Sequence, residues 1–167
     1  SGDGERAREL AALVNYDRVG PGEFYDNCGT PDRQPHFDFS SGELYYGTGI
    51  WPEASRPSQR YYNYTAMRQP GLRFRYRGLD QKAAYRVEVV YPNPKGVSFA
   101  LNSPNVFEVY ADGERIGEGR PSGEGFDRFA FDIPAGLTSD GALDIEIRKK
   151  AGEAVCTCIS EIWIRKR

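Results

Sequence analysis

Short alternating segments after residue 60 constrain the fold of this chain more than any other feature. In "LRFRYRGL", Leu72, Phe74 and Tyr76 share one side while arginines occupy the other, and "AAYRVEVVYP" alternates in the same way. A period of two is the pattern of a strand with one buried face. "NVFEVYADGERIGEG" predicts two more strands joined by a tight turn at Asp112-Gly113, a dipeptide that favours hairpins.

The later segments continue this pattern to the end of the chain. "FDRFAFDIPAG", "GALDIEIRKK" and "CISEIWIRKR" bring the total to about seven or eight strands, with a turn roughly every 8–12 residues and no helix between them. The sequence therefore predicts an all-β fold, an antiparallel β-sandwich of the jelly-roll type.

The first part of the chain differs in character. "ERARELAALV", residues 5–14, has apolar residues on one helical face and charged residues opposite. Those apolar residues are Ala7, Leu10, Ala11 and Val14. Residues 15–60 are too rich in Gly and Pro for long regular elements. We predict a linker or lead-in helix over 1–14 and one β-sandwich domain over 15–167, a length that suits a single core.

Charge and hydropathy exclude some partners. Lys plus Arg is 22 and Asp plus Glu is 24, a net charge of −2 that gives no support to nucleic-acid binding. No apolar run approaches the roughly 20 residues of a membrane span, so no membrane partner is predicted. There are 17 Arg against 5 Lys. Guanidinium groups match carboxylates well, which would suit acidic ligands, but we favour the simpler interpretation of a GC-rich genome.

The three cysteines leave the compartment open. Cys156 and Cys158 are two apart on a predicted strand, so they point the same way and are poorly placed to bond each other. Cys28 could bridge to either one, or all three could be thiols.

No catalytic signature occurs in the sequence. The sequence lacks the G-x-S-x-G, H-E-x-x-H and P-loop patterns. Its single histidine, His36, is predicted to be a structural or surface residue rather than a catalytic base. Paired carboxylates of the kind that hydrolyse glycosides would have to come from the acids in the loops. These acids are Asp26, Asp32, Asp38, Glu43 and Glu53. Nothing singles out two of them, and we predict no catalytic residue.

Aromatic residues crowd into one loop region, from Tyr45 to Tyr64. Sugar rings present apolar C–H faces ringed by hydroxyls, so a sugar site needs a flat aromatic platform and a few fixed polar groups. The predicted ligand-binding residues are Trp51, Tyr45, Tyr46, Arg60 and Tyr62. In the alternative interpretation, Tyr62 and Tyr64 simply pack the sandwich.

A carboxylate stands inside the last apolar strand. On a continuous strand Glu161 shares a face with Ile159 and Trp163, and a buried carboxylate would need a cation or several donors. Calcium prefers such oxygen ligands, and the loop "YDNCGTPD" offers more of them. The predicted calcium ligands are Asp26, Asn27, Asp32 and Glu161. The alternative is that Glu161 lies on a solvated face.

The segment "CISEIWIRKR" resembles the closing strand of galactose-binding-like β-sandwich domains, which include discoidin-type modules and several carbohydrate-binding modules. In many of these the glutamate of that strand ligates a structural calcium ion together with a loop near the N-terminus, and Glu161 and the segment 26–32 match those two parts. "LRFRYRGLDQKAAYRVEVVYP" and "NVFEVYADGERI" are similar to malectin-like domains. Asp26-Asn27-Cys28-Gly29 departs from the usual Asp-Gly-Asp loop.

The resemblance implies a non-catalytic carbohydrate-binding module of a larger secreted polysaccharide-degrading enzyme. Its expected partners are a polysaccharide or oligosaccharide and a catalytic domain of the same parent chain. We expect a monomer that is secreted, periplasmic or at the cell surface, with structural Ca²⁺. The alternatives are a structural or interaction sandwich that packs against a catalytic domain, and a small glycan-active hydrolase or lyase.

Overall fold

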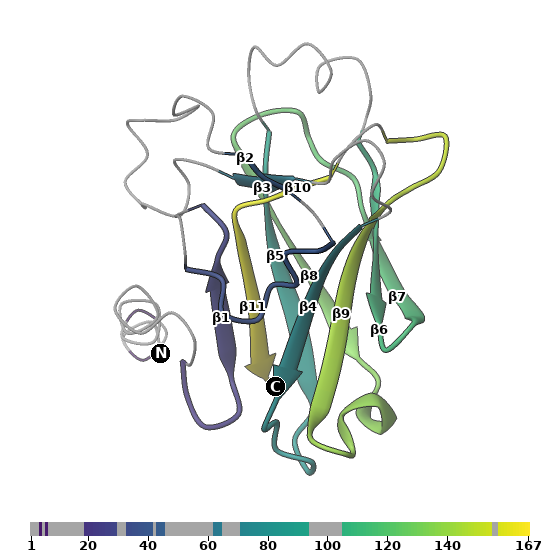
Figure 1. Cartoon of the computed structure of the whole chain (residues 1–167). Helices are drawn as coiled ribbons and strands as arrows, with labels where there is room; N and C mark the ends of the chain where they lie inside the picture. The colour runs from purple at the N-terminus through teal and green to yellow at the C-terminus, as the bar shows by residue number, and fades with distance from the viewer. Residues whose placement is uncertain are drawn as a thin grey trace.

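A computed structural model describes residues 4, 6, 19–29, 33–41, 43–45, 62–64, 71–93, 105–154 and 157–167. Over these residues β-strands are the main regular structure, joined by turns and loops (Figure 1). The elements are β1 Phe24–Asn27, β2 Glu43–Tyr45, β3 Tyr62–Tyr64, β4 Gly71–Arg77, β5 Tyr85–Pro92, β6 Phe107–Ala111, β7 Glu114–Gly119, β8 Phe126–Ile133, the 3-10 turn η2 Ala135–Thr138, β9 Ala142–Lys149, β10 Cys158–Ile159 and β11 Glu161–Lys166.

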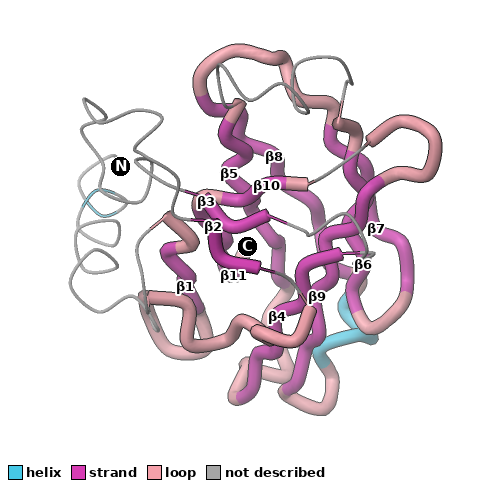
Figure 2. Tube along the Cα trace, turned by 45° about the horizontal axis from the view of Figure 1, so that its top comes forward, coloured by secondary structure: helices cyan, strands magenta, loops and turns pink. Residues whose placement is uncertain are grey.

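Two four-stranded antiparallel sheets form the two layers. One has the order β1-β11-β5-β8 and the other β4-β9-β6-β7. A three-stranded sheet, β10-β3-β2, lies across one end of the sandwich, at the top of Figure 1 and toward the viewer in Figure 2. The prediction of an antiparallel β-sandwich is confirmed.

The core lies between the two layers, where the alternating residues meet. On β4 the apolar side chains are fully buried and the arginines between them are exposed, as the pattern predicted. Rings join the two sheets: Tyr91 of β5 stacks on Phe107 of β6 at 5.5 Å between ring centres. Phe129 of β8 meets the same ring edge-on at 5.1 Å. Aromatic contacts between the layers thus fix their spacing at this end of the core.

The predicted hairpin is confirmed, with a two-residue turn between β6 and β7. Asp112 and Gly113 have φ angles of 47° and 83°. Two positive φ angles in succession are those of a type I′ turn, whose twist matches that of the flanking strands. This turn places Asp112 beside β9, where it borders the site described below.

The closing segment is two strands rather than one continuous strand. β10 pairs with β3, whereas β11 pairs with β1 and β5, and the change of sheet occurs at Ser160, whose N–H donates to the Val90 carbonyl at 3.0 Å. Ile159 consequently belongs to the main core while Trp163 lies on the other side of the sheet. The prediction that Glu161 shares a face with Ile159 was therefore wrong.

The predicted lead-in helix over 5–14, apart from residue 6, lies outside the described residues, and so does the whole of 46–61. In the parts of the chain that are described, no helix is long and apolar enough to cross a membrane.

Close packing of the β6–β7 hairpin can be tested at Gly119. A Cβ atom there would collide with the ring of Phe107, which is fully buried and cannot move aside. We expect Gly119→Ala to lower the free energy of unfolding by about 1–3 kcal/mol, the usual effect of overpacking. The matched control is Gly136→Ala in η2, where an added Cβ meets nothing within 4 Å. Urea denaturation of both variants measures the difference, and equal midpoints would contradict this packing.

Candidate functional site

The predicted aromatic site is described only in part. Trp51, Tyr46 and Arg60 lie outside the described residues. Tyr45 and Tyr62 are partners across the β2–β3 pair in the small end sheet. The backbone therefore brings these two positions together, and the sugar-binding role of all five residues stays a prediction.

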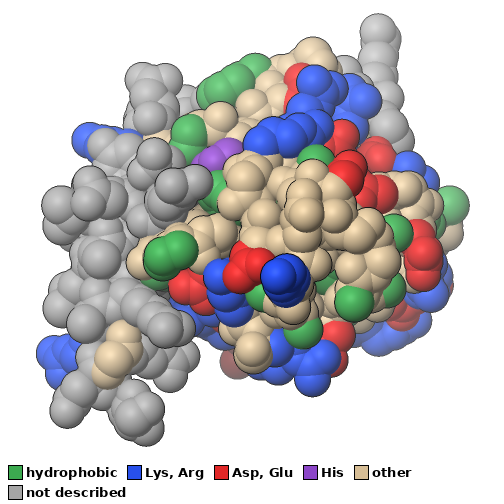
Figure 3. All heavy atoms as spheres, turned by 90° about the horizontal axis from the view of Figure 1, so that it is seen from below, with side chains coloured by type: hydrophobic (Ala, Val, Ile, Leu, Met, Phe, Trp, Pro, Cys, Tyr) green, Lys and Arg blue, Asp and Glu red, His purple; other side chains and the backbone are tan. Residues whose placement is uncertain are grey.

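Asp26, the first predicted calcium ligand, points into the sandwich. Its carboxylate accepts hydrogen bonds from the His36 backbone N–H and the Tyr76 hydroxyl, each at 3.0 Å. His36 Nδ1 lies 3.0 Å and 3.2 Å from its two oxygens. Three groups thus satisfy a carboxylate that has no exposed surface, as burial requires. His36 is 16% exposed and reaches the surface in Figure 3.

Glu161 and Asn27 point the other way. They are partners across β11 and β1, and the alternation of strands directs them to the face opposite Asp26. Glu161 is fully buried, so its predicted alternative, a solvated carboxylate, is wrong. Its Oε2 accepts the indole N–H of Trp163 at 3.1 Å.

Two side chains pack on the Trp163 ring. The Tyr25 ring lies 4.1 Å from it, and the Arg165 guanidinium lies 4.3 Å from it. Glu161 therefore belongs to a polar and aromatic cluster on the outer side of β11. The indole N–H of Trp163 supplies one of the hydrogen bonds that a buried carboxylate requires.

The four predicted calcium ligands do not converge. Asp26 is separated from Asn27 and Glu161 by the sheet itself, and Asp32 lies outside the described residues. Among the described residues no group of three or more His, Cys, Asp or Glu could hold a metal ion. Calcium binding stays a prediction, and its candidate ligands on one face are now Asn27 and Glu161.

Cys28 and Cys158 are both buried thiols of the core, and Cys156 lies outside the described residues. A bridge between Cys28 and Cys158 is thus not formed.

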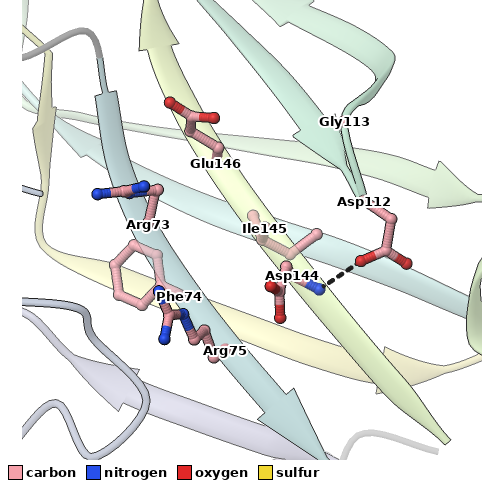
Figure 4. Close-up of a pocket in the computed structure, with 8 residues that line it drawn as sticks. All are labelled: Arg73, Phe74, Arg75, Asp112, Gly113, Asp144, Ile145 and Glu146. Carbon is pink, nitrogen blue, oxygen red and sulfur yellow. Dashed lines mark hydrogen bonds between the residues drawn. The ribbon is translucent and has the colours of Figure 1, made fainter.

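A pocket of about 380 Å³ opens on the outer face of the second sheet. Figure 4 shows how β4, β9 and the β6–β7 turn contribute to it. Its lining residues are Arg73, Phe74, Arg75, Asp112, Gly113, Asp144, Ile145 and Glu146. The side chains of Phe74 and Ile145 belong to the core, so the pocket walls are charged.

Register explains why opposite charges meet here. Antiparallel pairing sets Arg73 opposite Glu146 and Arg75 opposite Asp144. Side chains directly opposite each other on one face interact, and opposite charges stabilise the pair of strands. The pocket therefore lies between a row of guanidinium donors and a row of carboxylate acceptors.

Asp38 does not line the pocket, but its carboxylate contacts the two arginines of β4 that do. Its Oδ2 lies 3.0 Å from Arg75 Nη2 and 3.8 Å from Arg73 Nη2. The Ser40 hydroxyl and backbone N–H donate to Oδ1 at 2.6 Å and 3.0 Å. Hydrogen bonds from Ser40, with smaller contributions from the two arginines, hold the pKa of Asp38 below its usual range. Asp38 therefore stays an anion in a fixed position.

Phe39, the next residue, is 55% exposed, and it is the one large exposed hydrophobic side chain of the described residues. Its ring contacts Phe37 edge-on at 5.1 Å. An exposed ring beside fixed polar groups has the elements of a sugar-stacking surface.

The pocket was not predicted from the sequence, although two signals for it were present. Arginines alternate along "LRFRYR" and acids alternate along "LDIEI". Only the knowledge that β4 pairs with β9 shows that these two rows face the same side.

No protein-family model and no curated protein matches the sequence. Solved structures do resemble the fold. A calcium-binding mutant of beta-glucuronidase 2 from Bacteroides uniformis superposes with a TM-score of 0.55 and 18% identity, over 87% of this chain and 18% of that one. The ANX1 ectodomain from Arabidopsis thaliana gives 0.61 and 11%, over 86% of this chain and 41% of that one.

A third structure, CBM35 from Cellvibrio japonicus Abf62, gives a TM-score of 0.52 and 9% identity, over 86% of this chain and 92% of that one. The chain shares the β-sandwich fold of these structures, and at 9–18% identity the likeness shows the fold alone. The matched region spans 18% and 41% of the first two proteins and 92% of CBM35. The resemblance seen in the sequence is confirmed for the fold.

Because of the buried network around Asp26, we expect the free energy of unfolding to change with pH in the alkaline range. Burial, followed by the nearby Asp26 charge, raises the pKa of Tyr76 well above 10.0. Above pH 10 an unfolded chain loses the Tyr76 proton while the folded chain keeps it, so the free energy of unfolding falls as pH rises, by up to about 1.4 kcal/mol per pH unit. We expect this slope to be smaller in Tyr76→Phe.

The same variant should lose about 1–3 kcal/mol at neutral pH, because Asp26 loses a donor. Urea denaturation of both proteins from pH 8 to pH 11 gives the two slopes. Identical slopes would contradict the assignment of the titration to Tyr76.

Proposed function

We propose that this chain is a non-catalytic carbohydrate-binding module. One observation carries the proposal: the sandwich presents a pocket of fixed donors and acceptors on a rigid sheet face. The shared fold with CBM35 supports the proposal by analogy, because a fold can host many functions and the site must decide between them.

The chemistry of the pocket suits a sugar. Arginine presents several N–H donors in one plane, and a carboxylate accepts hydrogen bonds from two neighbouring hydroxyls. Arg73 and Arg75 extend from β4, and Asp144 and Glu146 extend from β9, so both kinds of group are held by strands rather than by loops. A site built on strands loses little backbone freedom on binding.

We further propose that the module belongs to a secreted polysaccharide-degrading enzyme and works as a monomer outside the cytoplasm. Binding through a shallow site is weak, and tethering would raise the local concentration of the polysaccharide at a catalytic domain of the same chain. The predicted aromatic residues Trp51 and Tyr46 would add stacking contacts with sugar rings.

Binding to a panel of soluble polysaccharides by affinity electrophoresis, followed by calorimetry on those retained, tests the function. We expect Arg75→Gln to weaken binding about tenfold, since a charged hydrogen bond contributes about 1.5–3 kcal/mol. The control is Arg86→Gln, a partly exposed arginine of β5 that lies on the other sheet. A wild-type protein that binds no glycan would refute the function. Binding lost in Trp51→Ala but kept in Arg75→Gln would place the site in the loop predicted from the sequence.

Calcium is tested separately, and we propose Asn27 and Glu161 as its ligands. We expect a chelator to lower the melting temperature of the wild type, because an ion that binds only the folded state stabilises it. Glu161→Gln should abolish this response, although its amide oxygen still accepts the Trp163 N–H. Asp26→Asn should keep the response, because Asp26 faces the opposite side of the sheet. A chelator without effect on the wild type would count against the ion.

A further inference from the structure

We infer that the outer-face pocket selects uncharged saccharides over acidic or basic ones, and that Asp38 sets this selectivity. The inference rests on the proposed function and adds the ligand class to it. It depends on how the charges of the pocket are already paired.

Cations and anions balance in and around the pocket. The charged groups that line it or bond to its lining are four arginines and four carboxylates. They are Arg73, Arg75, Arg77, Arg148, Asp38, Asp112, Asp144 and Glu146. A balanced pocket exerts little net field on an ion, so it gives no general attraction to a charged ligand. Figure 3, which views the molecule from below, shows acidic and basic side chains interspersed at that end as well.

An acidic sugar would have to compete with Asp38. Both pocket arginines of β4 already contact the Asp38 carboxylate. Ser40 anchors that carboxylate, and the Asp38 N–H donates to the Arg73 carbonyl at 2.8 Å, so it cannot swing away. A uronate would therefore approach a fixed anion without displacing it, and like charges at close range repel.

A basic sugar meets the corresponding obstacle on β9. Asp144 lies 2.8 Å from Arg77, and Glu146 lies 2.7 Å from Arg148. Asp112 has no ion pair among the described residues, but its Oδ1 accepts the Asp144 N–H at 2.8 Å. An ammonium group would gain one unpaired carboxylate and face four guanidinium groups nearby.

The hydroxyl groups of a neutral sugar can bind without displacing any ion pair of the pocket. A guanidinium has five N–H donors and a carboxylate about four acceptor positions, and each ion pair here uses only some of them. Arg75 bonds Asp38 through Nη2, and Asp144 bonds Arg77 through Oδ1. Adjacent hydroxyls of a neutral sugar can therefore bridge from the arginine row to the carboxylate row while every ion pair remains intact.

Matched glycans test the inference. The probes are polygalacturonan and its fully methyl-esterified form, in which an uncharged ester replaces each carboxylate, and chitosan and soluble N-acetylated chitin oligosaccharides, in which an uncharged acetamide replaces each amine. Neutral glucan, mannan and xylan complete the panel. We expect the wild type to bind neutral members at least about tenfold more tightly than any charged counterpart. We also expect less than a twofold change in affinity between 50 and 300 mM NaCl, because a neutral ligand forms no ion pair for salt to screen.

The deciding variant is Asp38→Asn. It keeps an acceptor for Ser40 but removes the charge, so the arginines of β4 become available to an anion. We expect the ratio of acidic to neutral affinity to rise about tenfold. The control, Asp132→Asn, makes the same change in net charge on the other sheet, where Asp132 pairs with Arg86 and Arg167.

Each outcome decides one proposal. A wild type that binds no glycan refutes the proposed function, and the inference falls with it. A wild type that prefers the acidic members, or an Asp38→Asn ratio no different from that of Asp132→Asn, overturns the inference and leaves the function standing. Neutral preference together with a shift confined to Asp38→Asn supports both.

Discussion

The antiparallel register of β4 and β9 is the constraint on which both the core and the pocket depend. One residue in two along each strand is apolar and faces the sandwich, and the residues between them are charged. Arg75 is thereby opposite Asp144, and Phe74 is opposite Ile145 on the inner side. A slip of one residue would expose the core residues and bury the ion pairs, so the hydrophobic core fixes the charge pattern of the outer face. The strand pairing that holds the core therefore also positions the backbone of the pocket.

In the other sheet, β1 and β11 have buried side chains on both faces. This burial on the outer face accounts for the environment of Glu161 in the closing strand. The inner face of this sheet packs the core, while Trp163 on its outer face is enclosed by Tyr25 and Arg165. Glu161 accepts the indole N–H there, so the acid has a protein partner as part of its environment. The same alternation turns Asp26 inward, away from Glu161. The two carboxylates that appeared to belong to one ion site therefore serve two different environments.

Sequence patterns predicted the elements better than the site, for a physical reason. Alternation is local, so the strands from Gly71 onward and the Asp112-Gly113 turn could be predicted without knowledge of their partners. The break at Ser160 depends on the exchange of one neighbouring strand for another, which leaves no mark in the local pattern. The pocket joins residues about seventy positions apart, and the bond from Tyr76 to Asp26 spans fifty. Contacts at such separations are set by topology, which periodicity alone does not reveal.

The buried Asp26 network and the surface pocket are joined by the short segment between His36 and Asp38. Asp26 accepts the His36 backbone N–H in the interior, while the His36 carbonyl accepts the Arg75 N–H at 2.8 Å and Asp38 bonds the Arg73 carbonyl. The segment is thus fastened to β4 from one side and to a buried carboxylate from the other. The Asp38 carboxylate contacts both arginines of the pocket. Its position depends on the hydrogen bond between the His36 backbone and the buried Asp26 carboxylate. Asp26 has no exposed surface and does not line the pocket, yet it places the group that sets the charge balance there.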